Sequence, residues 1–334
     1  MKKQEILQTE KAIALTKTFF SQELCKSLHL FPVSAPLIVH ANTGINDDLN
    51  GIERAVSFPV KFLNDNHAVI VHSLAKWKRI RIKELELNPY EGILTDMKAL
   101  RPDEDSSPIH SIYVDQWDWE LKIEAYNRSL SYLKNIVRTI YQALLKTEEE
   151  INKQFNILPD LPKKLSFIQS EQLLQLYPML SPKERENRIT KEYGAVFIIG
   201  IGSTLSDGKV HDNRSSDYDD WSTPTEENYK GLNGDLLVWN SRLNSALELS
   251  SMGIRVDKDA LSRQLEIKGE LQKKELHYHQ LLLNNKLPLT IGGGIGQSRI
   301  CMQLLHKKHI GEVQASIWPE EEKKQAELDG LHFL

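Results

Sequence analysis

The chain has 334 residues, a net charge of −4, 40% hydrophobic residues and 26% charged residues, a composition typical of globular proteins. Its length exceeds the roughly 250–300 residues at which a single core stops growing, so one elaborated domain and two closely joined domains are both possible. Lysines and arginines form no block, which argues against tight nucleic-acid binding, because such affinity depends on many phosphate contacts.

The N-terminus and the cysteines indicate the cellular compartment. The residues after Met1 are charged and contain no apolar signal-peptide core. No apolar run approaches the ~18 residues needed to span a bilayer. Cys25 and Cys301 are the only cysteines, which is too few for a thiolate metal site and does not suggest a disulfide. We therefore expect a cytoplasmic protein without membrane contact.

The N-terminal part predicts a long helix followed by an extended strand. Apolar side chains form one stripe along a helix over residues 4–30. Residues 33–39 then predict a strand that contains Pro36. Proline lacks the N–H that a central strand needs, so this strand should lie at a sheet edge or at an interface.

The next segment, residues 42–51, is polar and rich in turn-forming residues, and loops of this kind often carry function. It contains Asp47 and Asp48, which are either ordinary turn aspartates or groups with a chemical role. Apolar residues alternate over 56–62 and recur over 68–71, with a polar turn between the two runs. This pattern predicts a β-hairpin and therefore an antiparallel sheet.

Two further segments predict a polar cleft. Residues 92–101 form a strand that ends at Arg101, and residues 109–120 alternate as a second, antiparallel strand. The second strand carries Gln116 and Asp118 as well as two tryptophans, which together are poor core material. We interpret this pair of strands as the lining of a functional cleft.

The middle of the chain contains a false signal for dinucleotide binding. After a long amphipathic helix predicted over 121–157, a buried strand at 195–199 ends in Gly200-Ile201-Gly202. Leu205 occupies the position of the third fingerprint glycine, and residues 206–221 lack the periodicity of a crossover helix. We therefore reject a Rossmann unit and expect residues 206–221 to be a long functional loop.

Two carboxylates lie in strands that are otherwise apolar. Segments 234–240 and 246–256 predict another strand pair, with Asp235 in the first strand and Glu248 in the second. Buried carboxylates are seldom left unpaired. The pair is therefore either structural, in salt bridges, or a site for Mg²⁺, which takes one or two carboxylates together with phosphate oxygens.

Four glycines fall within five positions between Thr290 and Arg299, after an apolar strand and before helical spacing. Glycine lets the backbone approach a ligand closely. A following helix would direct free N–H groups at an anion, and Arg299 would add a planar charge. The segment predicts a backbone surface against which a phosphate group or a nucleotide binds. The alternative is a tight turn without a ligand.

These features resemble a known family. The helix before Pro36, the strand ending in Arg101 and the glycine segment ending in Arg299 occur in the order of motifs 1, 2 and 3 of class II aminoacyl-tRNA synthetases. The chain is more closely similar to ammonia-dependent asparagine synthetases of type A, the aspartate–ammonia ligases. That similarity extends over nearly the whole chain, in segments 72–79, 97–105, 113–120, 217–224, 249–256 and 292–299.

The sequence departs from the family pattern at three places. The neighbours of Asp47 differ, the segment around Ser106-Ser107 is one residue shorter, and the tail after Trp318 is divergent. In the first departure, Asn46 and Asp48 flank Asp47 where the family pattern has other residues.

The resemblance implies an α+β fold, with a mixed, mainly antiparallel sheet flanked by helices. It implies one class II synthetase-like catalytic domain over residues 1–334, with the N-terminal helix and the Pro36 strand at a homodimer interface. The implied reaction converts L-aspartate, ATP and ammonia into L-asparagine, AMP and diphosphate through a β-aspartyl-adenylate.

The resemblance also implies roles for individual residues. In the catalytic set, Arg101 and Arg299 would clamp the phosphates and Gln116 would line the aspartate pocket. Asp47 completes the set as our own candidate, because a carboxylate beside the acyl carbon could bind ammonium and take its proton. Asp235 and Glu248 would hold Mg²⁺. The remaining ATP-site residues are His110, Arg214, Gly292 and Gly294. The remaining aspartate-pocket residues are Ser73, Lys78, Asp118, Asp219, Ser251 and Arg255.

Two other functions are weighed against this one. A tRNA-charging or other amino-acid-adenylating enzyme of the same fold is disfavoured by the negative charge and by the lack of an evident anticodon-binding module. A non-catalytic relative should have lost arginines or acids from the nucleotide site, and all of them are present here.

Overall fold

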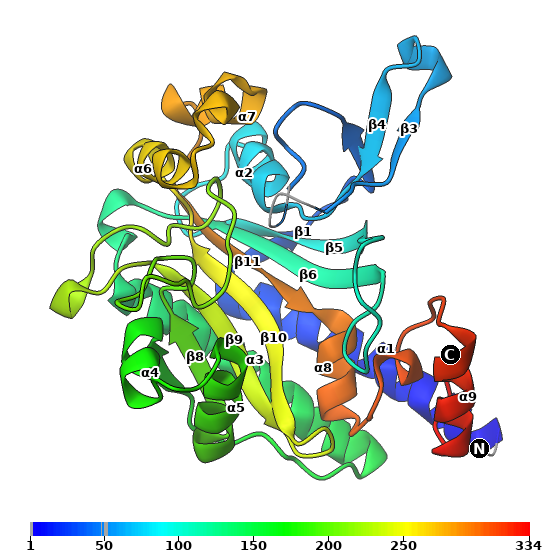
Figure 1. The fold of residues 1–334 in the computed structure, drawn as a ribbon. Helices are drawn as coiled ribbons and strands as arrows, with labels where there is room; N and C mark the ends of the chain where they lie inside the picture. The colour runs from blue at the N-terminus through cyan, green and yellow to red at the C-terminus, as the bar shows by residue number, and fades with distance from the viewer. Residues whose placement is uncertain (1–2, 48, 50–52) are drawn as a thin grey trace.

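The computed structural model describes residues 3–47, 49 and 53–334. Its centre is a sheet of eight strands (Figure 1). In spatial order these are β1 (Leu30–Pro32), β5 (Gly92–Leu100), β6 (Tyr113–Lys122), β11 (Thr290–Gly296), β10 (Ser245–Ile254), β9 (Asn233–Asn240), β8 (Ala195–Ile199) and β7 (Ser166–Gln169). The outer pairs β1–β5 and β7–β8 are parallel and the inner pairs are antiparallel. The predicted mixed, mainly antiparallel sheet is confirmed.

Two long helices cover one face of this sheet (Figure 1). Helices α1 (Lys3–Leu28) and α3 (Leu130–Phe155) pack against each other, and with α8 (Gln297–Leu304) they bury the main hydrophobic core against the strands. The apolar stripe of each long helix faces inward, as its spacing of three and four residues requires. The ring of Phe20 lies 4.7 Å from that of Trp117 and joins α1 to β6.

Six further α-helices complete the described part of the chain. They are α2 (Ala75–Glu84), α4 (Ser170–Leu176), α5 (Pro182–Tyr193), α6 (Lys258–Lys268), α7 (His277–Leu283) and α9 (Glu320–Leu328). Helices α2, α6 and α7 gather at one end of the sheet (Figure 1), where α6 and α7 share a small apolar core. Within the described part of the chain, no helix combines the length and the apolar character that crossing a membrane requires.

A second, small sheet stands apart from the main body (Figure 1). Its strands β2 (Ile38–His40), β4 (His67–Ile70) and β3 (Ser57–Pro59) are antiparallel, in that order. The predicted hairpin is confirmed. The single strand predicted over 33–39 is wrong, because the chain makes β1 before it and β2 at its end. Pro36 lies between them in irregular backbone that serves two different sheets.

The long loop and the absence of a Rossmann unit are confirmed. After β8 the chain enters irregular structure and returns as β9, antiparallel to β8, with no crossover helix between them. The start of α3 differs from the prediction, which placed it at residue 121. Strand β6 continues to Lys122, and the Ser129 side chain accepts a hydrogen bond from Tyr132 N to cap the helix there.

Candidate active site

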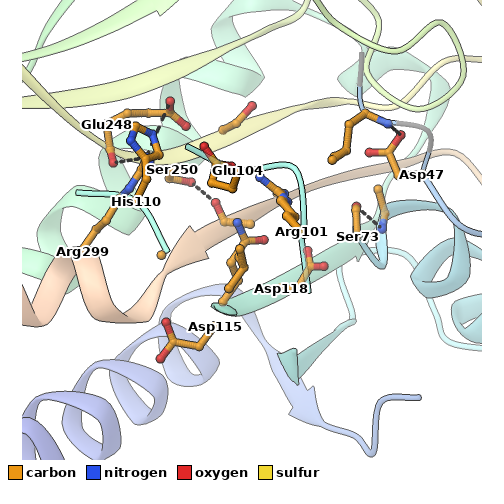
Figure 2. A pocket seen from close by; sticks show the side chains of 18 of the residues that line it. Asp47, Ser73, Arg101, Glu104, His110, Asp115, Asp118, Glu248, Ser250 and Arg299 are labelled. Carbon is orange, nitrogen blue, oxygen red and sulfur yellow. Dashed lines mark hydrogen bonds and ion pairs between the residues drawn. The ribbon is translucent and has the colours of Figure 1, made fainter. Parts of the chain in front are cut away.

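A cavity of about 510 Å³ lies over strands β6, β10 and β11 and between the loops that carry Asp47, Arg101 and Arg214 (Figure 2). Most of the predicted site residues line it. They are Asp47, Ser73, Arg101, His110, Gln116, Asp118, Arg214, Asp219, Glu248, Ser251, Arg255, Gly294 and Arg299. Lys78, Asp235 and Gly292 are not in the lining, and all three are buried. Asp48, the second candidate of its loop, lies outside the described residues.

The glycine-rich segment differs from the prediction, because its glycines lie within strand β11 rather than in a turn after it. Two of them, Gly292 and Gly294, make room for polar side chains of the protein. A Cβ on Gly292 would lie 2.6 Å from Trp119 O and 2.7 Å from Arg255 Nη2, and closer still to the Glu120 carboxylate. A Cβ on Gly294 would lie 2.9 Å from Gln116 Cδ. The glycines therefore admit the buried polar groups of the site itself.

The N-terminus of α8 is also different from the prediction, because a protein carboxylate already occupies it. Asp115 of β6 accepts hydrogen bonds from Ser298 N at 3.2 Å and Ser298 Oγ at 2.6 Å, and Lys17 of α1 lies 2.8 Å away. Burial alone would raise the pKa of Asp115, but Lys17 and Ser298 bring it below its ordinary value. This carboxylate stabilises the start of α8 and so fixes Arg299 one turn in.

A cluster of five buried charged side chains forms one wall of the site. Lys78 Nζ pairs with Asp118 and donates to Trp119 O at 2.8 Å, and Glu120 lies 3.7 Å away. Arg255 binds Glu120 through two nitrogens, at 2.8 and 3.0 Å, and pairs with Asp219. Their side chains are at most 4% exposed. We call Lys78, Asp118, Glu120, Asp219 and Arg255 the buried ion cluster.

The buried ion cluster contains two cations and three carboxylates. Burial raises the pKa of Asp219. Burial would raise the pKa of Glu120 too, but Arg255 and Lys78 hold it below its ordinary value. With all groups ionised the cluster has a net charge of −1, so it can accept one cation from a ligand in the cavity.

Arg101 and Arg299 both line the cavity, Arg299 at one end and Arg101 between the two ends (Figure 2). Arg101 follows β5, donates weakly to His72 O at 3.4 Å and has a buried Nε without a hydrogen-bond partner among the described residues. Arg299 donates to Glu248 O at 3.1 Å. Figure 2 shows Arg299, His110 and Glu248 at one end of the cavity and Asp47 and Ser73 at the other. Arg101 therefore keeps free donor capacity for an anion.

His110 should remain neutral throughout the physiological pH range. Burial, and then the positive charges of Arg299, Lys183 and Arg101, lower its pKa to about 4. A histidine with a depressed pKa adds stability that is complete above its unfolded pKa of about 6.5 and is lost as the pH falls toward 4. We therefore expect the free energy of unfolding to fall less between pH 6.5 and 4 in His110→Asn than in the parent. Urea titrations across this range test it, and an equal fall in both proteins would contradict it.

Asp235 and Glu248 lie on neighbouring strands, but they do not form an isolated carboxylate pair. Arg214 pairs with Asp235 and also lies 2.6 Å from Asp212. Oδ1 of Asp235 is buried and has no hydrogen-bond partner among the described residues. Burial raises the pKa of Asp235 to about 7, with a further increase from Glu248. Among the residues that the structure describes, no three His, Cys, Asp or Glu side chains converge as a metal site.

Asp47 is 2% exposed and lines the end of the cavity opposite Arg299. Its carboxylate accepts a hydrogen bond from Leu49 N at 3.1 Å, and its carbonyl oxygen lies 3.1 Å from His72 Nδ1. Burial raises its pKa, with Lys76 as the strongest opposing charge. A carboxylate whose pKa is raised toward neutrality can take a proton more readily than an ordinary aspartate.

Comparisons with known proteins agree with this geometry. The family model described as aspartate-ammonia ligase matches residues 7–330. A protein of Parabacteroides distasonis named aspartate–ammonia ligase is 57% identical over 98% of this chain and 95% of its own length. A protein of the same name from Bacteroides fragilis is 54% identical over 99% of this chain and 96% of its own. The chain belongs to the aspartate–ammonia ligase family.

Solved structures show the wider fold class of this aspartate–ammonia ligase family member. Asparaginyl-tRNA synthetase of Pyrococcus horikoshii, complexed with asparaginyl-adenylate, matches with a TM-score of 0.67 over 93% of this chain and 70% of that chain. The enzyme of the same name from Entamoeba histolytica matches with a TM-score of 0.65 over 93% and 67%. Both are 16% identical to the chain, so they establish the fold alone. The predicted class II synthetase-like fold is confirmed.

Sequence reasoning missed several charged residues of this family member's site. Glu120 was not selected as a site residue. It lies two positions after Asp118, which was selected, and strand alternation places both side chains on the same face of β6. Glu104 lines the cavity and was not selected either. Lys76, Asp217 and His279 lie outside the cavity lining and come from three distant segments, and no spacing in the sequence connects them.

Proposed function

We propose that the chain catalyses the ATP-dependent amidation of L-aspartate by ammonia, with release of AMP and diphosphate. The observation that carries the proposal is the pairing, in one cavity, of a buried ion cluster of net charge −1 with the two arginines Arg101 and Arg299. The family relationship supports the same reaction. An amino acid with one ammonium group suits the cluster, and a polyphosphate suits the arginines.

The reaction would proceed in two displacements. A β-carboxylate oxygen of aspartate attacks the α-phosphorus of ATP, and the bond from that phosphorus to diphosphate breaks. Ammonia then attacks the acyl carbon of the β-aspartyl-adenylate, AMP leaves, and a proton passes from nitrogen to a base. Arg101 lies between the two ends of the cavity in Figure 2, where it can stabilise the phosphate that both steps share.

The buried ion cluster would hold aspartate with its α-groups away from the reacting carboxylate. Arg255 is the cluster's cation in the cavity lining and suits the α-carboxylate. Asp118 and Asp219 are its carboxylates in the lining and suit the α-ammonium. Gln116 and Ser251 line the same region and can donate hydrogen bonds to the substrate.

Mg²⁺ would be held by Asp235 and Glu248. The unpartnered buried Oδ1 of Asp235 and the half-exposed Glu248 carboxylate fit an ion that takes one or two carboxylates and completes its shell with phosphate oxygens and water. Bound there, it would neutralise charge on the ATP phosphates. Asp235→Asn should raise the Mg²⁺ concentration for half-maximal activity by about tenfold, the lower end expected for loss of a metal-site interaction. An unchanged Mg²⁺ dependence would exclude Asp235 as a ligand.

Asp47 would bind ammonium and take its proton before the second displacement. Asp47→Asn should retain aspartate-dependent exchange between diphosphate and ATP, because adenylation does not need the base. Amide formation should fall by about a hundredfold, the low end of what a general base contributes. Equal loss of both activities would show that Asp47 does not act in the ammonia step.

The chain would act as a homodimer. Phe31 in β1, Leu37 just before β2 and Ile38 in β2 are 51%, 50% and 48% exposed. A second copy would remove these apolar side chains from water. Sedimentation equilibrium should therefore give twice the mass of the chain, and a monomer at micromolar concentration would contradict this.

The function is tested by incubating the protein with ATP, aspartate and ammonium. Asparagine and AMP should form in equal amounts. When the side-chain oxygens of aspartate carry ¹⁸O, the label should appear in AMP. Label in inorganic phosphate, with ADP as the nucleotide product, would indicate an acyl-phosphate route and contradict the proposal.

A further inference from the structure

A second group of charged side chains lies behind the cavity wall, apart from the buried ion cluster. Asp217 is fully buried and accepts hydrogen bonds from Lys76 Nζ at 2.8 Å, His279 Nε2 at 3.0 Å and Ser215 Oγ at 2.7 Å. Lys76 and His279 are 2% and 0% exposed. These residues come from α2, the long irregular segment and α7, and Lys76, Asp217 and His279 are absent from the cavity lining. They therefore do not touch a substrate in the cavity.

The same residues support the loop that carries Asp47. Tyr278 N donates to Thr43 O at 3.4 Å, which attaches the loop to α7. Gly44 has a φ of 75°, and a Cβ there would lie 2.9 Å from Leu276 Cβ and 3.2 Å from His279 Nδ1. The loop backbone thus lies directly against His279. Any movement of His279 would displace the loop.

Electrostatics connects the group to Asp47. Burial raises the pKa of Asp47, Lys76 opposes that effect most strongly, and Asp217 adds to it. An ionised carboxylate only accepts hydrogen bonds, so Nε2 of His279 carries the proton shared with Asp217. With a neutral imidazole, Asp47, Asp217 and Lys76 together have a net charge of −1. One bound ammonium ion would bring this charge to zero.

We infer that Lys76, Asp217 and His279 form a positioning triad that fixes the place and the charge of Asp47 for the ammonia step. The inference rests on the role proposed above for Asp47. Asp217 holds the Lys76 ammonium, whose charge opposes the effect of burial on Asp47, and His279 holds Asp217 and lies against the loop. When Asp47 takes a proton from ammonium, an N–H bond breaks, an O–H bond forms and neutral ammonia is left to attack the acyl carbon.

The groups that face Asp47 determine what its titration should show. The charges that act on the Asp47 carboxylate are those of Lys76 in α2, Asp217 in the irregular segment and Arg101 after β5. His72 contacts the Asp47 carbonyl oxygen, and Asp47 acts in turn on Tyr218. Asp217 and Tyr278 face His279, and Arg79 contacts Tyr278. Burial raises the pKa of Tyr218 well above its ordinary value. Asp47, whose pKa burial raises, therefore remains the group to which we assign the acidic limb of kcat/KM for ammonium.

The test compares two substitutions that should move this limb in opposite directions. Lys76→Met removes a positive neighbour of Asp47, so the acidic limb of kcat/KM for ammonium should move up by about one pH unit, which is about a tenfold loss at low pH. Asp217→Asn removes a negative neighbour, so the limb should move down. Both variants should keep diphosphate exchange within about threefold of the parent, because adenylation does not use Asp47.

Two controls separate charge from structure. Lys76→Arg keeps the charge and should restore the position of the limb. Lys146→Met breaks an exposed pair with Glu23, 2.9 Å long, and should change neither activity nor limb. If Lys76→Met does not fold, His279→Gln, which retains an N–H donor for Asp217, should lower kcat/KM for ammonium while exchange is maintained.

The outcomes also separate this inference from the role of Asp47. If Asp47→Asn loses exchange and amide formation equally, the role of Asp47 is wrong and the triad inference falls with it. If Asp47→Asn loses only amide formation, but Lys76→Met and Asp217→Asn shift the limb in the same direction or not at all, the triad inference alone is overturned.

Discussion

Replacing Gly292 by alanine should remove most of the stability of the fold. The new Cβ would lie 2.7 Å from Arg255 Nη2, 2.6 Å from Trp119 O and closer still to the Glu120 carboxylate. Trp119 O belongs to the neighbouring strand, so it cannot move without breaking the pairing of β6 with β11. Overpacking costs about 1–3 kcal/mol and breaking a buried ion pair about 3–5 kcal/mol. We expect the free energy of unfolding to fall by at least about 4 kcal/mol.

Gly296→Ala is the matched control, because it adds the same methyl group to the same strand. A Cβ at Gly296 would lie 3.4 Å from Arg299 Cβ, and the other neighbouring atoms are those of the flexible Arg299 side chain. The backbone at Gly296 has a φ of −66°, which alanine adopts without strain. Its unfolding free energy should therefore change by less than about 1 kcal/mol. Urea unfolding of both variants checks the prediction, which equal destabilisation would contradict.

Part of the candidate site could be predicted because the alternation of residues along a strand shows which side chains share one face. Gln116 and Asp118 were predicted to face a cleft, and the structure places both in the cavity lining. Arg101 was predicted at the end of a strand, and it directly follows β5. The order of the motifs then allowed the class II fold to be recognised, and the solved structures confirm it.

Other features could not be predicted because they depend on contacts between distant segments. The glycines of β11 were interpreted as making room for a nucleotide. Their neighbours Glu120 and Arg255 lie about 172 and 37 positions away in the chain, and no local pattern reports such packing. The N-terminus of α8 was likewise expected to bind an anion, but Asp115 of β6 accepts the hydrogen bond from Ser298 N there. In both cases a side chain of the protein occupies the place where the local sequence predicts a ligand.

Lys78→Met should be the second strongly destabilising substitution, by about 3–5 kcal/mol, because it leaves buried carboxylates uncompensated. Lys78 is fully buried, and without it Asp118, Glu120 and Asp219 would have only Arg255 as a counter-charge in the buried ion cluster. Adding Asp118→Asn removes one of the uncompensated charges, so the double variant should be more stable than Lys78→Met alone.

An exposed lysine serves as the control for the loss of Lys78, and the KM for aspartate is a second measurement. Lys98→Met breaks an exposed pair with Asp96, 2.8 Å long, and should cost less than about 1 kcal/mol. In the Lys78→Met/Asp118→Asn variant the cluster keeps its net charge of −1, but the pocket that we propose for aspartate loses a carboxylate. The KM for aspartate should therefore rise even though stability partly recovers. If the double variant is no more stable than Lys78→Met, the loss of stability comes from packing of the lysine stem rather than from charge, and the electrostatic account of the cluster is wrong.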